Sequence, residues 1–448
     1  MKAFKSKIYM GLLCAGILTP IGINAQSLEQ AVAYTLDTHP DIRAAYTYFK
    51  VSEKKVDQAK SGYLPTLDLT GGIGYEYTDS PSTRSDDGSE DLVRRELGVS
   101  LKQNLFSGFH TQSEVGRTRF AASAEQWRLY ASAEDLALKV SQVYVDYIKA
   151  EQLVELSEKN LASHQEIYDQ IKVRTDSGFG SKADLSQIEG RLANAESNLI
   201  AAKNNFLDSQ VAFYRVISQS PDNLVIPYPD SSLLPTNKED GLKLAFENHP
   251  VIRAAANDIN SADYQYEAAK STDYPQISLE IDANMDNNLD GTNGEYNEVV
   301  AMVRFSYNLF SGGKDHAYTK ETAYKRNEAK ELNRSAFRQV EEEYQLSWNA
   351  YELLNMQKKF IKTHVVSAKN TQSDYKEQFQ VGRRTLLDLL DTENELYQAR
   401  RDFLAAEFDE ISAQYRIFHA MGILIDALRV TRPDAWKGEV QYTGGVSQ

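Results

Sequence analysis

The chain has 448 residues, a formal net charge of −15 and a single cysteine. An acidic protein is a poor binder of polyanions, so this charge argues against a nucleic acid partner. After the N-terminal segment, no stretch reaches the roughly 18 consecutive apolar residues that a membrane-spanning helix needs.

Residues 1–25 have the pattern of a secretory signal peptide. Three lysines precede an apolar run, and the small residue Ala25 suits cleavage. Cys14 lies inside this segment but does not follow a small residue, so lipidation there is only the alternative. The mature chain, starting near Gln26, has no cysteine and a net charge of −18, because the segment carries three lysines and no acid. Disulfides and thiol catalysis are thereby excluded, and a periplasmic, secreted or outer-membrane protein remains.

The two halves of the chain repeat one another. The segment 39–45 reads HPDIRAA and recurs at 249–255 as HPVIRAA. The segment NLFSG at 104–108 recurs unchanged at 308–312. The two offsets differ by six residues, so one copy has a longer loop between these segments.

This repetition divides the chain into domains. Repeat 1 spans residues 26–219, and repeat 2 spans residues 239–425. A proline-rich equatorial linker, residues 220–238, joins them, and residues 426–448 form a polar C-terminal tail.

Each copy contains two segments in which apolar and polar residues alternate. Segments of about ten residues with one apolar and one polar face fit the strands of a membrane barrel. A soluble sheet with one wet face is the alternative, but the chain offers no second sheet for it. The predicted strands are about 66–78, 93–105, 276–286 and 298–309.

The polar faces of these strands would line an aqueous lumen. They carry Asp68, Glu76, Glu96, Lys102, Glu280, Asp282, Asp286 and Arg304. The set has a net charge of −4 per subunit, so an open barrel should favour cations.

The predicted helices are very long. Residues 110–176 and 314–380 contain no proline and only one glycine, and each would be about 100 Å long at the rise of an α-helix. Helices at about 181–219 and 384–422 follow them. The last one has apolar residues every seven positions, which is typical of a coiled coil. These residues are Leu390, Tyr397, Leu404, Ile411 and Phe418.

Four strands cannot close a barrel, and an open sheet edge in lipid leaves backbone groups unpaired. Two copies would give eight strands, whose interior side chains nearly fill, whereas three copies would leave an aqueous lumen. The predicted fold class is therefore mainly α with a membrane β part. It is a trimeric 12-stranded β-barrel, with four strands per subunit, continued by a long periplasmic α-helical coiled-coil tunnel and built from two internal repeats.

Two copies of strand–strand–long helix–turn–helix, the NLFSG junctions and the segment VGRRTLLDLLD at 381–391 resemble the outer membrane efflux protein (TolC) family. The resemblance covers roughly residues 27–425. It implies a homotrimeric exit duct in outer-membrane lipid, with its helical part in the periplasm. It also implies a periplasmic adaptor and an inner-membrane ABC transporter or RND-type pump as partners.

The sequence gives fewer indications of the cargo than of the family. Segments 93–108 and 178–192 are most similar to family members that serve type I secretion of large proteins such as adhesins. A channel for small-molecule or multidrug efflux is the alternative.

Two turns join the long helices to the helices that follow them. Each has a glycine suited to the left-handed position after a helix, then a hydroxyl residue suited to an N-cap, then an aspartate at N3. By the resemblance, these turns would dock the adaptor and act as hinges. They contain Gly178, Ser181 and Asp184 in copy one and Gly382, Thr385 and Asp388 in copy two.

The second turn carries further charge. Asp391 lies one helical turn beyond Asp388 on the same face. By the resemblance, Asp388 and Asp391 correspond to an acidic ring at the pore entrance. Arg384 corresponds to a latch residue, with Asp184 as its expected partner. Phe379 stands where some relatives have a tyrosine that adds a latch hydrogen bond. Helix capping is the alternative role for Asp184 and Asp388.

An enzyme is the main rival class. The seven histidines show no metal-ligand spacing. The run SGGK at 311–314 is similar to a phosphate-binding loop, but copy one has SGFH at 107–110, so the glycines more simply make the turn. The sequence therefore predicts no enzyme, no catalytic residue, no metal and no cofactor. A periplasmic coiled-coil structural protein would leave the four strands unexplained.

Overall fold

The computed structural model describes residues 26–86 and 90–438, so the predicted signal peptide lies outside the described residues. In chain order the elements are α1 (Leu28–Thr38), α2 (Pro40–Ser61), β1 (Thr66–Thr78), α3 (Pro81–Asp86), β2 (Glu90–Ser107), α4 (His110–Asp176), α5 (Lys182–Ile217), η1 (Ser231–Leu233), α6 (Lys238–Asn248), α7 (Pro250–Ala269), η2 (Lys270–Asp273), β3 (Gln276–Leu289), β4 (Thr292–Ser306), α8 (Lys314–Gln380), α9 (Leu386–Ala420), α10 (Leu424–Ala427) and η3 (Asp434–Lys437).

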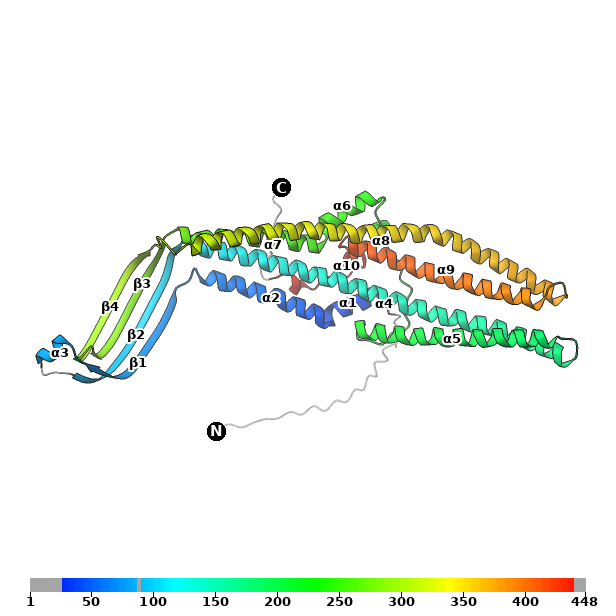
Figure 1. The fold of residues 1–448 in the computed structure, drawn as a ribbon, viewed down its shortest axis with the longest axis horizontal. Coiled ribbons are helices and arrows are strands. Elements are labelled where there is room, and N and C mark those ends of the chain that lie inside the picture. The colour runs from blue at the N-terminus through cyan, green and yellow to red at the C-terminus, as the bar shows by residue number, and fades with distance from the viewer. Residues whose placement is uncertain (1–25, 87–89, 439–448) are drawn as a thin grey trace, which may run out of the picture.

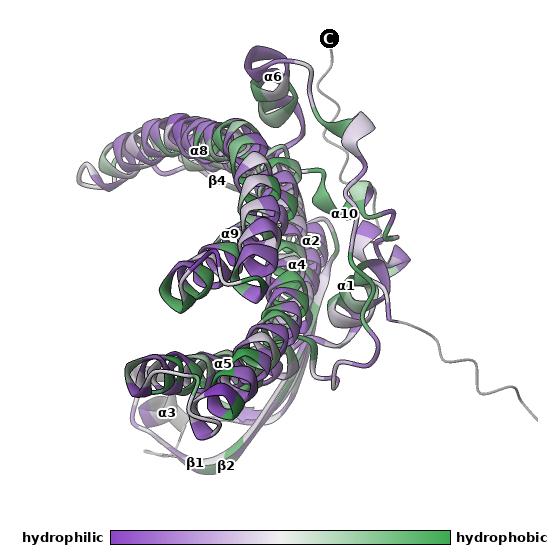
Figure 2. Cartoon of the chain, turned by 90° about the vertical axis from the view of Figure 1, so that its right-hand side faces the viewer, coloured by the Kyte–Doolittle hydropathy of each residue, from purple (hydrophilic) through white to green (hydrophobic). Residues whose placement is uncertain are grey.

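The molecule is elongated, with a sheet at one end and long helices running away from it (Figure 1). The order helix–strand–strand–long helix–helix occurs twice, first from α2 to α5 and then from α7 to α9. Viewed along its length, the helical part is a curved wall with α5 at one edge and α8 at the other, while α9 lies on the concave side (Figure 2).

The four strands form one antiparallel sheet in the order β1-β2-β3-β4. Thr66↔Lys102↔Glu280 and Asp68↔Ser100↔Asp282 are paired across β1, β2 and β3. Because side chains alternate along a strand, this register places all eight predicted lumen residues on one face. The other face exposes large apolar side chains, which suits contact with lipid. They include Leu67, Leu69, Ile73, Tyr75, Val299, Val303 and Phe305.

The strand ends differ in part from the prediction. β1 has the predicted bounds, whereas β2 extends three residues further at its start and two at its end. β4 begins earlier than predicted and stops at Ser306. The Asn308 side chain accepts a hydrogen bond from the Phe310 backbone N–H at 3.0 Å, and this local turn replaces strand pairing there.

The long helices α4 and α8 span 67 residues each, as predicted. α5 and α9 are slightly shorter than predicted, since Ser181 and Thr385 stand just outside them as N-caps. Each long helix lies antiparallel to the helix that follows it, which gives two helical hairpins, α4/α5 and α8/α9 (Figure 1).

The main core lies midway along the helical part. Its largest fully buried side chains include Phe49, Leu129, Tyr144, Phe213, Tyr344, Phe408 and Phe418. The Tyr144 hydroxyl lies 2.7 Å from the Gln26 carbonyl oxygen and accepts a hydrogen bond from the Val225 N–H at 3.0 Å. This tyrosine therefore fixes both the start of the described chain and the equatorial linker to α4.

The C-terminal segment is not the polar tail that the sequence predicts. Leu428 and Val430 are 4% and 8% exposed, and Trp436 is only 4% exposed. The Gln126 amide donates a hydrogen bond to the Trp436 carbonyl at 2.7 Å. The prediction was wrong up to residue 438 because these apolar side chains complete the core against α4; the remaining residues, 439–448, lie outside the described part.

A buried histidine joins helices from both halves of the chain. His419, at the end of α9, forms hydrogen bonds with Glu343 of α8 (2.8 Å) and Asp135 of α4 (2.9 Å). Burial alone would lower the pKa of His419, but these two carboxylates raise it to about 9. Nearby His249, whose ring lies edge-on to His419, has its pKa lowered to about 4 by burial and by the charge of His419.

The shifted pKa values of these two histidines predict that the stability of the fold falls at alkaline pH and also at acidic pH. The raised pKa of His419 stabilises the fold fully below about 6.5, the value for an unfolded histidine, and this contribution is lost as pH rises through about 9. The lowered pKa of His249 penalises the fold as pH falls from about 6.5 toward about 4.

His419→Gln should therefore flatten the alkaline fall of the thermal midpoint, measured on detergent-solubilised protein from pH ~6 to ~10. His364→Gln, which removes a half-exposed histidine on α8, is the matched control and should leave that fall unchanged. An identical alkaline profile in the His419 variant would contradict the assignment.

Candidate functional site

The two helical hairpins end in turns at the same end of the molecule, far from the sheet (Figure 1). We call this end the tip. Gly178 and Gly382 have φ angles of 79° and 77°, the left-handed conformation predicted for them. A side chain would strain the backbone at either position, so both glycines are needed for the sharp reversal.

The N-caps differ between the two turns. In the second turn, Thr385 accepts a hydrogen bond from the Asp388 N–H, and Asp388 accepts one from the Thr385 N–H, both at 3.2 Å. The Thr385 hydroxyl and backbone N–H hold the pKa of Asp388 below its usual range. In the first turn, Ser181 accepts from the nearer Ala183 N–H at 3.1 Å. The reciprocal capping box therefore exists at Asp388 and not at Asp184.

Arg384 and Asp184 do not form the predicted latch within the subunit. The Arg384 Nε donates to the Gln378 side-chain oxygen at 3.0 Å, and its guanidinium lies 4.1 Å from the centre of the Tyr375 ring. Both partners belong to α8, so Arg384, which lies in the turn after α8, folds back along the helix that precedes it. An aromatic face and an amide on the preceding turns satisfy the guanidinium without reaching the other hairpin.

Other residues connect the two hairpins at the tip. Arg191 of α5 pairs with Asp391 of α9 at 2.8 Å. Lys376 of α8 pairs with Glu166 of α4 at 3.2 Å. Sequence reasoning missed Arg191, Glu166 and Lys376, because the register between distant helices cannot be read from either helix alone.

Phe379 cannot form the hydrogen bond of the tyrosine that some relatives have at this position, but it makes other contacts. Its ring is 7% exposed, and the Arg174 guanidinium of α4 lies 5.2 Å from the ring centre. This cation–π contact also joins the two hairpins. The ring belongs to a small apolar cluster, the tip cluster, which consists of Ile167, Ile171, Ile188, Phe379, Leu386, Leu389 and Leu390.

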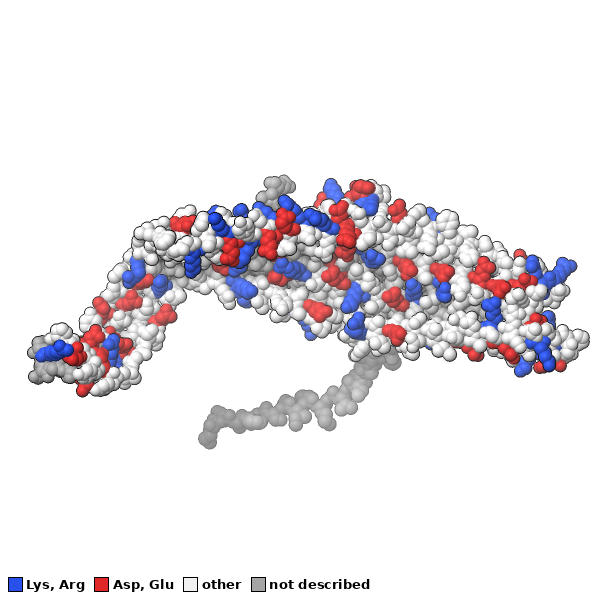
Figure 3. All heavy atoms as spheres, in the orientation of Figure 1, with Lys and Arg blue, Asp and Glu red and all other residues white. Residues whose placement is uncertain are grey.

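Acidic and basic side chains are interspersed over the helical part and its tip (Figure 3). The polar face of the sheet is similarly mixed. Glu280 pairs with Lys102 at 3.1 Å and with Arg304 at 2.5 Å. Arg94 and Glu298 also lie on this face and were missed; their two charges cancel one another.

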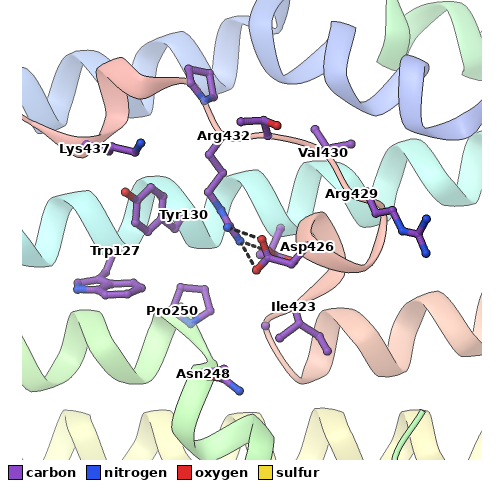
Figure 4. A pocket seen from close by; sticks show the side chains of 14 residues that line it. Trp127, Tyr130, Asn248, Pro250, Ile423, Asp426, Arg429, Val430, Arg432 and Lys437 are labelled. Carbon is purple, nitrogen blue, oxygen red and sulfur yellow. Dashed lines mark hydrogen bonds and ion pairs between the residues drawn. The ribbon is translucent and has the colours of Figure 1, made fainter. Parts of the chain in front are cut away.

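A cavity of about 670 Å³ lies between α4, α7 and the C-terminal segment (Figure 4). Its central Arg432 donates to Asp426 at 2.7 Å and to Glu134 at 3.1 Å. Burial raises the pKa of Glu134, and the guanidinium acts against that rise. These charged groups bind one another, and the Arg432–Glu134 ion pair beside the cavity fastens the C-terminal segment to α4.

The part of the chain that the structure describes shows neither a metal site nor a membrane-spanning helix. Within residues 26–86 and 90–438, no group of histidine, cysteine and acidic side chains is arranged to hold a metal ion. None of the helices in those ranges combines the length and the apolar character needed to cross a bilayer.

A sheet with one polar and one exposed apolar face, continued by hairpins of 67-residue helices, defines a class of outer-membrane channel proteins. The family model "Outer membrane efflux protein" matches residues 32–219 and 241–423, and the chain belongs to this family. It is an outer-membrane efflux channel with a periplasmic helical part and is not an enzyme.

Relatives match over nearly the whole chain. The outer membrane efflux protein BepC of Brucella suis is 24% identical over 423 residues, covering 94% of this chain and 91% of BepC. The alkaline protease secretion protein AprF of Pseudomonas aeruginosa is 22% identical, covering 88% and 83%. The crystal structure of the Campylobacter jejuni CmeC outer membrane channel superposes with a TM-score of 0.77 at 15% identity, covering 89% of this chain and 86% of CmeC, which shows a shared fold.

The capping box predicts a measurable difference between the two turns. Thr385→Ala should destabilise the start of α9 by about 1 kcal/mol, because it removes the N-cap bond from the Asp388 N–H and the hydroxyl bond to the Asp388 carboxylate. Hydrogen exchange of the amides at 386–389 should speed up several-fold. Ser181→Ala, which removes a cap without a reciprocal acid, should have a smaller effect at 182–185; equal effects would contradict a special role for the box.

Proposed function

We propose that three copies of this chain form a 12-stranded barrel and a helical tunnel, and that this trimer is the outer-membrane exit duct of a tripartite export system. In this system an inner-membrane transporter and a periplasmic adaptor deliver substrate to the tip. The proposal rests above all on unpartnered features along both edges of the curved wall.

The first unpartnered feature is the sheet. β1 and β4 are its edge strands, and a lipid environment offers their backbone groups no water to bond. Pairing β4 of one copy with β1 of the next removes both edges at once. Closure after three copies gives twelve strands and a lumen lined by the polar face.

The second unpartnered feature is a pair of apolar stripes. On α5, Ile200, Leu207 and Tyr214 are 69%, 58% and 59% exposed. On α8, Leu346, Leu353 and Phe360 are 56%, 62% and 78% exposed. Both stripes repeat every seven residues, the spacing of a coiled-coil seam.

The two stripes match in position as well as spacing. α5 runs away from the tip and α8 runs toward it, so the stripes are antiparallel. Ile200 lies 18 residues from the start of α5, and Phe360 lies 20 residues from the end of α8. The levels agree to about 3 Å at the rise of an α-helix. Since α5 and β1 share one edge and α8 and β4 share the other, one rotation axis closes both seams (Figure 1).

At the tip, the hairpins would surround the entrance to the tunnel. Asp388 and Asp391 of α9 supply its acidic groups, with α9 on the concave side of the wall (Figure 2). The turns around Gly178, Ser181, Gly382 and Thr385 are the exposed ends that an adaptor would contact. Opening the entrance requires the two hairpins to separate, which breaks the contacts across the tip cluster.

Closure of the ring can be tested at the α8 stripe. Phe360→Glu should abolish trimers in detergent, measured by light scattering on a size-exclusion column, because it places a charge in an apolar seam. Lys362→Glu, on the exposed side of the same helix, is the control and should leave trimers intact. Persistent trimers and unchanged bilayer conductance in the Phe360 variant would overturn this assembly.

For the cargo, we propose type I secretion of a large protein such as an adhesin, delivered by an ABC transporter. The similarity to AprF, a protease secretion protein, supports this choice. The similarity to BepC, an efflux protein, favours small-molecule efflux through an RND-type pump as the second candidate.

Disruption of the gene separates the two kinds of cargo. We expect one or a few large proteins to disappear from the medium and to return on complementation with the wild-type chain but not with the Phe360→Glu variant. Sensitivity to hydrophobic antimicrobials should stay unchanged. An intact set of secreted proteins together with increased drug sensitivity would contradict protein secretion and support efflux.

A further inference from the structure

We infer that Arg191 is a specificity-determining residue of the entrance: it neutralises Asp391 while the two hairpins are together and uncovers this carboxylate when they separate. The inference rests on the proposed trimeric duct, and it assigns a role to a residue outside the VGRRTLLDLLD segment. The Arg191–Asp391 pair also makes the negative charge of the acidic ring depend on whether the entrance is open.

The geometry of the pair is specific. The Arg191 Nη2 lies 2.8 Å from the Asp391 Oδ1, within the range of a charge-assisted hydrogen bond. The two side chains are 32% and 57% exposed, so the pair remains in contact with water and with ions. Each residue belongs to a different hairpin, which makes the pair a bridge between the two repeats.

Buried apolar side chains of the tip cluster lie next to the two charged residues and keep them close together. Ile188 of α5 and Leu390 of α9 are fully buried in the tip cluster, and each lies within one turn of the charged residue on its helix. Packing of these side chains fixes the separation of α5 and α9. The low-dielectric cluster also strengthens the attraction on the side that faces away from water.

The pair alters the charge of the entrance. Without Arg191, Asp388 and Asp391 would place six carboxylates at the tip of a trimer. Three guanidinium groups at 2.8 Å from Asp391 offset half of that charge. The closed entrance then attracts cations mainly through Asp388, whose carboxylate is itself engaged by Thr385.

Separation of the hairpins reverses this state. When α5 moves away from α9, Asp391 loses its partner but stays on α9. Its carboxylate then faces the entrance without Arg191, while Arg384 stays with Gln378 and Tyr375 of its own hairpin. The Lys376–Glu166 pair also crosses the two hairpins, and its separation frees one cation and one acid, so it leaves the net charge of the entrance unchanged. The entrance therefore becomes more acidic as it opens, which couples cation attraction to opening.

The charge can be tested by divalent-cation block in planar bilayers. For Arg191→Gln, the Mg²⁺ concentration that halves the conductance should fall about threefold or more, because each subunit gains an unpaired negative charge. Asp391→Asn should remove this change, so that the double variant equals the Asp391→Asn variant. Arg191→Lys, which keeps the charge, should remain close to wild type.

A matched control distinguishes the effect of the Arg191–Asp391 pair from the effect of removing any positive charge at the tip. Lys182→Gln removes one positive charge from the same tip, one residue after Ser181, and forms no ion pair with Asp391. Its Mg²⁺ block should stay close to that of the wild type. An equal shift in the Lys182 and Arg191 variants, or an Arg191→Gln effect that persists in the Asp391→Asn background, would overturn the inference.

Failure of the duct itself would look different. If the wild-type chain gives no conductance, the proposed function fails, and the pair is then tested by cross-linking. The chain after residue 25 has no cysteine, so Arg191→Cys with Asp391→Cys supplies the only two thiols. A short bismaleimide should link them within one chain. Absence of that link, when a Glu166→Cys and Lys376→Cys pair does link, would overturn the pairing.

Discussion

Backbone groups at a sheet edge have no partner in the hydrocarbon of a membrane, and this constraint governs the architecture of the subunit. The chain supplies four strands and leaves β1 and β4 open. The same two edges continue into helices whose apolar stripes are exposed, with α5 on one side and α8 on the other. In the proposed trimer the chain is one section of a wall, and neighbouring copies cover both of its open edges.

The long helices connect the sheet at one end of the molecule to the turns at the other end. Each 67-residue helix spans about 100 Å, so a strand at one end and a turn at the other belong to one rigid rod. The core midway along the rods joins the two halves of the chain, partly through the His419 bridge to Asp135 and Glu343. The tip lacks such a core and has only the small tip cluster with a few polar contacts. A region held by so few buried side chains is suited to separate while the rest stays fixed.

Much of the fold could be predicted because it follows local periodicity. Period-two alternation located the strands, and the absence of proline located both long helices to the residue. The turn glycines, Gly178 and Gly382, followed from the need for a left-handed residue after a helix. The C-terminal segment was mistaken for a polar tail, since its few apolar residues show no period. Trp436 and its neighbours are buried only because α4 lies beside them.

The sequence by itself determined the two repeats, the number of strands, the lengths of the helices and the position of the tip. These properties depend on spacing along one segment and on backbone chemistry that acts locally. Only the tertiary structure decided which charges meet at the tip. Arg384 contacts the preceding helix α8, Asp388 is part of a helix cap, and Asp391 pairs with Arg191, two hundred residues away. Such pairs depend on the register between helices, which buried side chains such as Leu390 fix in three dimensions and which no periodicity within a single helix contains.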